Sequence, residues 1–355
     1  MSDAAADANL ESGPGDIDLT PAVRAALLNE MVEALGRYAL PEVAAKLQQA
    51  ICDRTQDGDS TLTSGIQFAA TLTAQLQTLS ADRHLCVHFS PTPLPQLTPD
   101  TEPSPDEIAR QHQQSQQRNF DINRVERLAG NIGYLQLFGF EPPEFAGAAM
   151  TAALTLLAHT DALVIDLRQN QGGSPQMVAL LCSYLLPAYP PVHLTTLYWP
   201  HENRQVQNWT LPYLPGPRYL DRPIYVLISP DTAAAAEEFA YTLQQLKRVV
   251  VVGETSAGGA NPGRGYRLHD HFWMFIPTGR VVSPITDSNW QGSGVVPNFK
   301  VPCELALATG HLLALKHLER HDSGPQREIQ AAITTVEKQL NQMQQDLIGQ
   351  MSGLR

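Results

Sequence analysis

The chain has 355 residues, of which 43% are hydrophobic and 17% are charged, a composition typical of a globular protein with a sizeable core. Its formal net charge of -12 at pH 7 argues against nucleic acid or an anionic membrane surface as a partner, because both would repel it. Four scattered cysteines and an acidic N-terminus without a signal segment predict reduced thiols and a cytoplasmic location. No apolar run approaches the roughly 20 residues that a membrane-spanning helix needs.

The first part of the chain predicts a leader followed by a small helical domain. Residues 1–18 are rich in small and acidic residues and are expected to be disordered. Thr20 followed by Pro21 is a typical helix start, because a hydroxyl N-cap precedes a proline at the first helical position. Apolar residues then recur at helical spacing in three successive segments, which predicts a helical N-terminal domain over 19–90.

An alternating pattern from Asp82 to Phe89 predicts a half-buried strand at the end of this domain. One face of the strand is apolar, and the other carries His84, Cys86 and His88. Imidazole and thiolate groups are common metal ligands, so these three residues are a conceivable metal site. Alternate positions on one strand without a further acidic or histidine partner are weak support, and we expect neither a metal nor a cofactor.

The rest of the chain predicts an α/β domain flanked by two different segments. Residues 91–124 are rich in Pro, Gln, Thr and Ser, which indicates a linker or a long surface loop. Over 125–310, apolar strands alternate with helices, which indicates an α/β fold with a mostly parallel sheet. Residues 311–355 are expected to be helical, with heptad-spaced apolar positions over 329–347. These heptads fit either a helix docked on its own domain or a coiled-coil homodimer.

Two strand-to-helix turns in the α/β region contain residue types suited to binding a carbonyl group. Gly172 and Gly173 follow an apolar strand, and paired glycines let backbone N–H groups approach a substrate oxygen. Ala234 and Ala235 precede a helix, whose positive end would favour a nucleophile and the anion that it creates. Alanine, however, has no group for covalent chemistry. Taken alone, the glycine turn could equally be a tight structural connection.

Several segments in order resemble the tail-specific (C-terminal processing) serine protease family. They are NRVERLAGNIGYLQL, DLRQNQGG, AAEEFAYTLQQL, VVGETSAGGANPG, DHFWMFIPTGR and NWQGSGVVPN. The similar branch includes the repeats of interphotoreceptor retinoid-binding protein and is related to the tricorn protease core. The resemblance runs over roughly residues 20–310 and implies a crotonase/ClpP-like core behind a helical domain, with serine peptidase chemistry.

The resemblance also implies roles for single residues. It places the nucleophile at Ala234, where the family has serine, and the oxyanion-hole donors at Gly172, Gly173 and Ala235. It makes His84, in an Asp-x-His-Leu motif, the candidate general base.

Two further positions depart from the family pattern. Gln291 replaces a glutamate that would orient the base, and Asn261 replaces a histidine common in a Gly-Gly-Ala-His-Pro turn. A neutral Gln291 would not stabilise an imidazolium as a carboxylate does. Ser229 and Ser256 lie near the predicted site, and we expect both to be structural.

Two interpretations of Ala234 follow. The chain is a natural pseudopeptidase that binds a peptide or a small hydrophobic ligand without cleaving it, or it is a genuine serine peptidase whose serine was replaced by alanine. We favour natural loss, because Gln291 and Asn261 would have no reason to change in a replacement made to trap a substrate.

Overall fold

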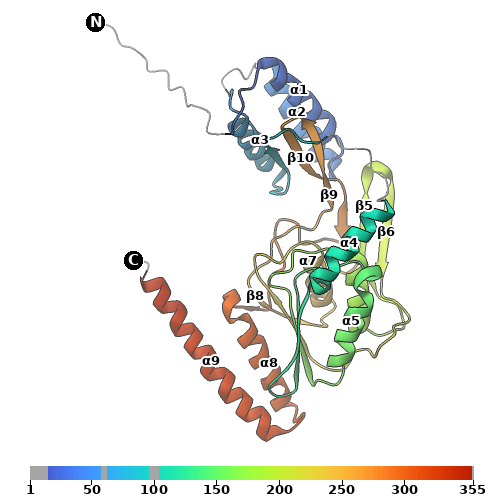
Figure 1. Ribbon diagram of the computed structural model, residues 1–355, viewed down its shortest axis with the longest axis vertical. Helices are drawn as coiled ribbons and strands as arrows, with labels where there is room; N and C mark the ends of the chain where they lie inside the picture. The colour runs from blue at the N-terminus through green and yellow to red at the C-terminus, as the bar shows by residue number, and fades with distance from the viewer. Residues whose placement is uncertain (1–14, 57–61, 96–103, 354–355) are drawn as a thin grey trace. The chain divides into compact units, whose positions relative to one another are not determined.

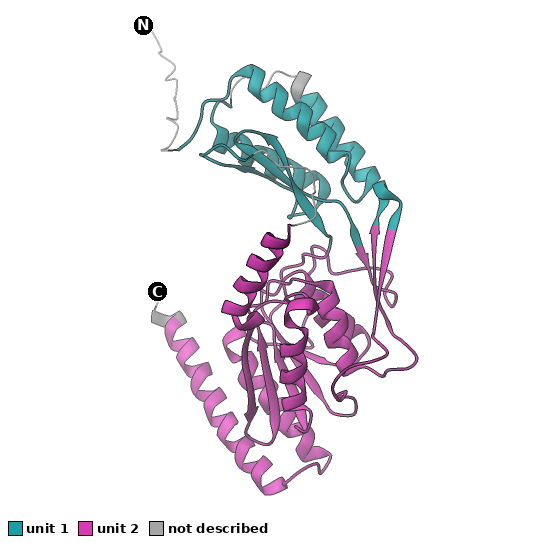
Figure 2. Cartoon of the chain, turned by 45° about the vertical axis from the view of Figure 1, so that its right-hand side comes forward, with its two compact units in different colours: residues 1–101, 199–204, 261–280 teal, residues 102–198, 205–260, 281–355 magenta. Residues whose placement is uncertain are grey.

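The computed structural model describes residues 15–56, 62–95 and 104–353. The chain divides into two compact units, which Figure 2 colours teal and magenta. Unit 1 comprises residues 1–101, 199–204 and 261–280, and unit 2 comprises residues 102–198, 205–260 and 281–355. Each unit has a hydrophobic core of its own.

In unit 1, three helices cover one face of an antiparallel three-stranded sheet. The helices are α1 (Pro21–Leu35), α2 (Pro41–Gln56) and α3 (Gly65–Ser80), and the sheet order is β1 (Cys86–Phe89), β10 (Phe272–Pro277), β9 (Gly263–His269). As predicted, Thr20 caps α1, and its hydroxyl oxygen accepts a hydrogen bond from the Val23 N–H. Val87 and Met274 are buried with the helices, so the predicted alternation of β1 is confirmed at Val87.

The structure differs from the predicted bounds of this domain at both ends. The β9–β10 hairpin lies in unit 1, although the sequence placed it in the α/β core. The reason is that the apolar face of β1 needs partner strands, and β10 supplies them from a distant part of the chain. Of the leader predicted to be disordered, residues 1–14 lie outside the described residues. Asp16 is ordered, because its Oδ2 accepts a hydrogen bond from the Ser64 hydroxyl over 2.5 Å.

Unit 2 contains a six-stranded sheet, and this sheet confirms the predicted α/β fold. Its order is β12 (Phe299–Lys300), β8 (Val250–Gly253), β7 (Ile224–Ile228), β4 (Ala162–Asp166), β3 (Ile132–Leu137), β2 (Ile122–Leu128). Only the β2–β3 pair is antiparallel, and the other neighbours are parallel. The carboxyl ends of β4 and β7 are therefore adjacent, which brings the two turns singled out in the sequence to one edge of the sheet.

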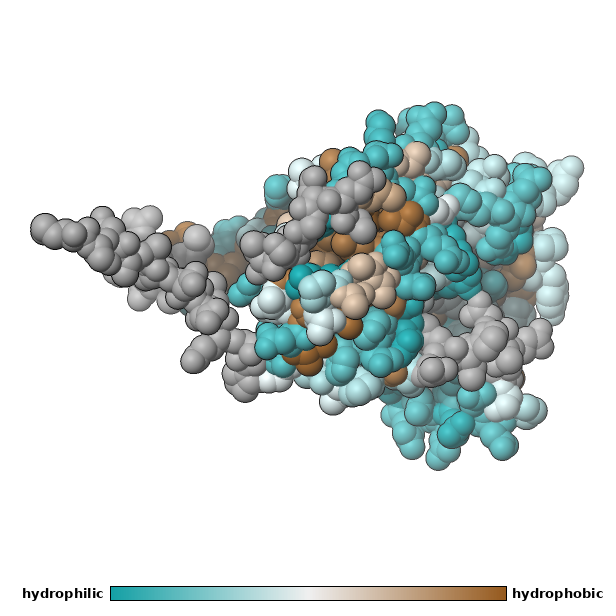
Figure 3. Space-filling model, turned by 90° about the horizontal axis from the view of Figure 1, so that it is seen from above, coloured by the Kyte–Doolittle hydropathy of each residue, from teal (hydrophilic) through white to brown (hydrophobic). Residues whose placement is uncertain are grey.

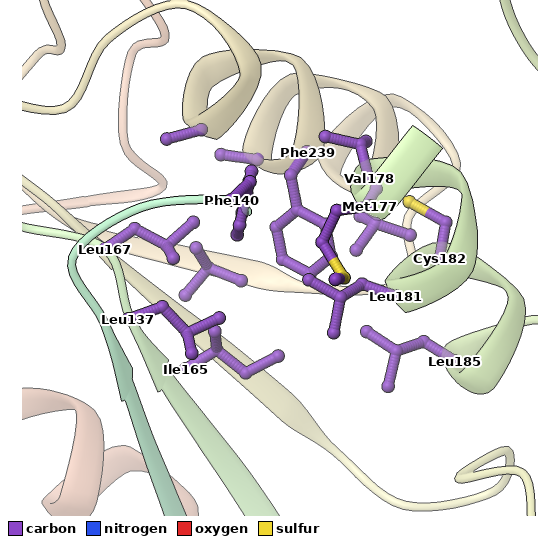
Figure 4. Close-up of a cluster of buried hydrophobic side chains, with 14 of the residues drawn as sticks. Leu137, Phe140, Ile165, Leu167, Met177, Val178, Leu181, Cys182, Leu185 and Phe239 are labelled. Carbon is purple, nitrogen blue, oxygen red and sulfur yellow. The ribbon is translucent and has the colours of Figure 1, made fainter. Parts of the chain in front are cut away.

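Helices cover both faces of this sheet, because its strands are buried on both sides. Leu163 and Ile165 of β4 pack with α5 (Pro143–Leu157), α6 (Pro175–Leu185) and α7 (Ala235–Gln245). Ala162 and Val164 face the opposite way, toward α8 (Ala306–Arg320) and α9 (Gln326–Gly353). Figure 4 shows side chains of the first cluster, among them Leu137, Phe140, Ile165, Leu167, Met177, Val178, Leu181, Cys182, Leu185 and Phe239.

The segment 91–124 was predicted to be a linker or loop, but it contains a helix, α4 (Pro105–Gln117), followed by a 3-10 turn at Asn119–Asp121. Ser104 and Glu107 form a capping box, in which each side chain accepts a hydrogen bond from the backbone N–H of the other. The helix has a single buried residue and therefore lacks an apolar stripe, which is why periodicity did not reveal it.

A third sheet has the order β11 (Arg280–Val282), β5 (His193–Trp199), β6 (Arg204–Trp209). Two further 3-10 turns lie at Pro200–Glu202 and Cys303–Leu305.

Hydrophilic residues cover most of the face seen in Figure 3, with apolar patches between them. No helix within the described residues is long and apolar enough to cross a bilayer.

The predicted C-terminal helix is α9, which runs alongside α8 (Figure 1). Ile329, Ile333 and Val336 are buried in the core of unit 2, whereas Ile348 is 65% exposed. The first part of the heptad segment is thus docked on its own domain. A homodimer through 329–347 stays a prediction.

Candidate functional site

Ala234 ends the turn between β7 and α7 in a strained backbone conformation, with φ 49° and ψ -118°. Such angles suit glycine, and holding an L-residue there costs on the order of 1–3 kcal/mol. Two hydrogen bonds hold the turn: the Ala234 N–H donates to Glu237 Oε2 over 3.0 Å, and the Ala233 N–H donates to the Asn170 carbonyl oxygen over 3.0 Å. Because strain of this kind concentrates at functional positions, the conformation marks the turn as a candidate site.

The glycine turn after β4 lies directly against Ala234. Gly172 and Gly173 both have positive φ, 103° and 132°. A Cβ added to Gly172 would stand 2.8 Å from Ala234 Cβ and 2.9 Å from Ala235 N, and one added to Gly173 would stand 2.2 Å from the Phe140 carbonyl oxygen. Neither position can hold a side chain, so the glycines are required by close approach as well as by φ. The structure thus brings together four of the predicted site residues.

Two backbone N–H groups at these turns are available to a ligand. Gly172 is not one of them, because its N–H donates to Asn170 Oδ1 over 2.9 Å. The N–H groups of Gly173 and Ala235 have no acceptor in the described part of the chain. The predicted set of carbonyl-binding donors is therefore reduced to Gly173 and Ala235, and Gly172 acts as the spacer that lets the two turns meet.

Asn170 carries a further unused donor, which the sequence analysis did not identify. Its side chain is completely buried, and its Oδ1 is fixed by the Gly172 N–H. The remaining side-chain atom, Nδ2, is buried and has no partner among the described residues. A buried donor without an acceptor costs on the order of 1–3 kcal/mol. The only sequence signal was the position of this asparagine between the strand and the paired glycines.

Glu237 joins the Ala234 turn to the glycine-rich loop after β8. Its side chain is completely buried. Oε1 accepts from the Ser256 hydroxyl over 2.5 Å and from the Gly258 N–H over 2.6 Å. Oε2 accepts from the Gly259 N–H over 2.8 Å in addition to the Ala234 N–H. Four donors on one buried carboxylate fix the position of both segments. The family resemblance assigned no role to Glu237.

The next residue, Glu238, is buried on α7 in a different environment. It accepts a hydrogen bond from the Thr195 hydroxyl over 2.7 Å. Burial raises its pKa to about 7, although hydrogen bonds from Thr195 and Asn208 act in the opposite direction. Burial also raises the pKa of the Cys182 thiol, and the nearby Glu238 carboxylate raises it further. Glu238 is thus a buried acid on α7 whose charge changes near neutral pH.

Gln291 lies in unit 2 and supports the same glycine-rich loop. Its Oε1 accepts a hydrogen bond from the Ala260 N–H over 2.8 Å. The expected structural roles of the two serines agree with their contacts, since Ser229 donates to the Arg168 carbonyl oxygen and Ser256 donates to Glu237. Both hydroxyls are thus engaged in hydrogen bonds that hold the surrounding loops.

His84 and Asn261 belong to unit 1, whereas the four residues at the turns belong to unit 2. His84 Nδ1 lies 3.4 Å from Asp82 Oδ1, and Asp82 is buried and also accepts from the Tyr38 hydroxyl over 2.9 Å. Burial raises the pKa of Asp82, but hydrogen bonds from His84 and Tyr38 outweigh it and leave that pKa below its ordinary value. A carboxylate that stays charged can orient and stabilise the imidazole. The Asp-x-His spacing was the available sequence signal for this pair.

Of the three residues of the conceivable metal site, Cys86 and His88 lie on β1, and His84 precedes that strand. Cys86 Sγ lies 2.9 Å from His88 Nε2. In the part of the chain that the structure describes, no group of three or more His, Cys, Asp or Glu residues is arranged to hold a metal ion.

Two family profiles match the chain. The profile of Peptidase family S41 matches residues 131–301, which include the glycine turn and the Ala234 turn. The profile described as the N-terminal domain of Peptidase S41 in eukaryotic IRBP matches residues 17–125. Both matches agree with the resemblance read from the sequence segments.

Individual relatives are distant and longer. The chain is 25% identical over 184 residues to carboxyl-terminal-processing peptidase 1, chloroplastic, of Arabidopsis thaliana, a match that covers 51% of this chain and 36% of the relative. It is 28% identical over 158 residues to the carboxyl-terminal-processing protease of Synechocystis sp., covering 44% of this chain and 35% of that protein. The chain thus matches about a third of the length of these curated relatives.

Among solved structures, the photosystem II D1 C-terminal processing protease has a TM-score of 0.50 to this chain at 17% identity. The match covers 79% of this chain and 94% of that one. At this identity the similarity concerns the fold alone.

Proposed function

Because the chain belongs to peptidase family S41, we propose that it is a pseudopeptidase that binds a peptide at the Ala234 turn without cleaving it. The observation that carries this proposal is the strained Ala234 conformation beside the N–H groups of Gly173 and Ala235, which have no acceptor among the described residues. A preorganised pair of backbone donors on two adjoining turns is an arrangement that can stabilise a carbonyl oxygen.

Binding and chemistry separate at Ala234. Acyl transfer needs a hydroxyl or thiol at this position to attack the carbonyl carbon, and a methyl group cannot form that bond. The backbone donors do not depend on the side chain at 234. A peptide carbonyl can therefore be held in the turn, while the step that would form an acyl-enzyme has no nucleophile.

Asn170 supports the same conclusion. Its unpartnered Nδ2 belongs to a side chain that is fixed to the glycine turn through Gly172. An acceptor on the bound ligand would remove the cost of leaving this donor unpaired. We therefore expect Asn170 to contribute to peptide affinity.

A second candidate is a genuine serine peptidase whose serine was replaced by alanine. The Asp82–His84 pair favours it, since a histidine with a charged partner is what a general base needs. The two candidates differ in what a single reversion restores. In the pseudopeptidase, Gln291 is a second departure from the family's catalytic residues. Peptide hydrolysis should then require both Ala234→Ser and Gln291→Glu.

Peptide hydrolysis by Ala234→Ser, with and without Gln291→Glu, tests this difference. We expect no turnover by the single variant and at most slow turnover by the double variant. Rapid hydrolysis by Ala234→Ser alone would establish the second candidate and reject natural loss of activity.

We also propose that the exposed end of α9 mediates a homodimer. Ile348 is largely exposed, whereas Ile333 is buried in the chain's own core. Removal of residues 344–355, which follow the last side chain of α9 that packs on the core of unit 2, should leave the fold intact and convert a dimer into a monomer in a sedimentation measurement. An unchanged mass after this truncation would dismiss the proposal.

A further inference from the structure

The outward face of the unit 1 sheet carries a small cavity of about 320 Å³. We propose that this cavity binds a compact aromatic carboxylate. It is lined by Leu94, Pro95, Gly265, Arg267 and Trp273, all within unit 1. The proposal concerns a different place from the Ala234 turn and does not depend on the function proposed for it.

The cavity exists because of how three strands present their outward residues. The register aligns His88, Trp273 and Arg267 across β1, β10 and β9. The indole of Trp273 stacks on the His88 ring, with centroids 4.0 Å apart and planes 13° apart. Gly265 on β9 adds no side chain, and a Cβ there would come within 3.1 Å of Trp273 Cε3. Because glycine has no side chain, the indole can lie over β9 at this position, and the cavity borders both residues.

The apolar wall of the cavity is held in place by the backbone. The Ser90 N–H donates to the His271 carbonyl oxygen over 2.8 Å, and the Leu94 N–H donates to the Asp270 carbonyl oxygen over 2.6 Å. These bonds fix the segment that carries Leu94 against the β9–β10 hairpin. The cavity is thus formed before any ligand arrives, which is typical of small-molecule sites.

The polar feature of the cavity is the guanidinium of Arg267, whose side chain is 23% exposed. Its Nε is buried and has no hydrogen-bond partner among the described residues. The other end of the guanidinium pairs with Asp270, which is 62% exposed and therefore neutralises the charge only weakly. A buried N–H on a cationic group favours an anionic acceptor, and a carboxylate has the geometry that a guanidinium binds best.

The chemistry of the remaining wall defines the rest of the ligand. The Trp273 indole offers an aromatic surface, and Leu94 and Pro95 are apolar. A volume of about 320 Å³ is near the lower end for small-molecule pockets, which suits one or two fused rings. These features together point to a flat aromatic group that bears one carboxylate next to Arg267.

Calorimetric titration of the full chain with 2-naphthoate tests the proposal, with 2-naphthalenemethanol as the uncharged analogue. We expect saturable binding of 2-naphthoate and at least about tenfold weaker binding of the alcohol, since the alcohol lacks the charged acceptor. Arg267→Gln should weaken 2-naphthoate binding about tenfold or more. Arg267→Lys should weaken it as well, because lysine keeps the charge but has no Nε–H. Arg264→Gln, on the same strand, is the matched control and should bind as the unchanged chain does.

Gly265→Val provides a second, steric test, because a side chain at 265 would meet the Trp273 ring that lines the cavity. We expect it to abolish 2-naphthoate binding, with circular dichroism confirming that the variant is folded. If that variant does not fold, the arginine variants decide the question alone. Equal binding of the acid and the alcohol, equal binding by Arg267→Gln, or no saturable binding at millimolar concentration would each overturn the proposal.

Discussion

The two turns at the carboxyl ends of β4 and β7 solve the same geometric problem with different residues. Both have positive φ, and at the glycine turn an added side chain would also meet neighbouring backbone. After β4 the chain uses Gly172 and Gly173, for which these angles cost nothing sterically. After β7 it uses Ala234, whose Cβ makes φ 49° and ψ -118° costly.

This difference between the two turns indicates the role of the turn after β7. If that turn were only a connection, glycine at 234 would relieve the strain. An alanine that keeps a strained geometry indicates a position shaped to present a side chain. The Glu237 carboxylate and Asn170 hold this geometry from two sides. The turn is therefore held in a strained conformation around a residue whose side chain is only a methyl group.

Removing the Glu237 carboxylate should have the largest effect on this comparison. Glu237→Gln puts an NH2 group against donors that now bind a carboxylate, which should lower the free energy of unfolding by about 4 kcal/mol. Urea denaturation measures this change. Asp231→Asn, an acid-to-amide change at an exposed position of the same turn, should change stability by less than about 0.5 kcal/mol. If the two variants are equally stable, Glu237 does not hold the turn.

The glycine turn should be nearly as sensitive. Gly173→Ala places a Cβ 2.2 Å from the Phe140 carbonyl oxygen at a φ of 132°. We expect a loss of about 3 kcal/mol in the free energy of unfolding, since both the clash and the backbone angle are unfavourable. Gly349→Ala in the exposed part of α9, where an added Cβ meets nothing, is the control and should stabilise slightly. A tolerated Gly173→Ala would mean that Gly173 does not lie against the Phe140 backbone at this positive φ.

Glu238 allows a pH test of the helix that follows the Ala234 turn. The pKa of Glu238 is about 7 in the folded chain, and its ordinary value is 4.5. Between these two pH values the folded chain therefore holds a proton that the unfolded chain has lost. The stability that this proton contributes is complete below about pH 4.5 and is lost as pH rises through 7.

Glu238→Gln removes this dependence. Relative to the unchanged chain, the variant should gain on the order of 3 kcal/mol between pH 4.5 and pH 7. Denaturation of both proteins across this range measures the gain. A stability difference that does not vary with pH would show that the acid titrates at its ordinary value.

The smallest expected effect is also the most direct check of strain at Ala234. Ala234→Gly should raise the free energy of unfolding by about 1 kcal/mol, because relief of the strained φ exceeds the added chain entropy of glycine. Ala235→Gly, one residue further in the helix, should do the opposite and lower it by a similar amount. If both variants are destabilised alike, the turn stores no strain.

The fold was predictable from the sequence wherever local pattern determines structure. Apolar strands alternating with helices indicated the parallel sheet, and Thr20-Pro21 located the start of α1. The β9–β10 hairpin was placed in the wrong unit because β10 pairs with β1, a segment far away in the sequence. The spacing of apolar residues along a strand does not indicate which distant strand it pairs with. Helix α4 was missed because it is exposed and has no apolar stripe, although its capping box was present in the sequence.

The candidate site was predictable at the positions that the family motifs contain. Gly172, Gly173, Ala234 and Ala235 do meet at one edge of the sheet. What the sequence could not supply was the pattern of hydrogen bonds. That Gly172 is already bonded, that Asn170 has a free donor and that Glu237 accepts four bonds all depend on three-dimensional contacts.

The central claim is that the Ala234 turn holds a peptide and does not cut it. Its most direct test incubates the unmodified, purified chain with a mixture of defined peptides and analyses protein and peptides by mass spectrometry. The account predicts that intact peptide is retained, that the protein gains no covalent mass and that no fragments accumulate. An acylated protein, or fragments formed at enzyme-like rates, would contradict it.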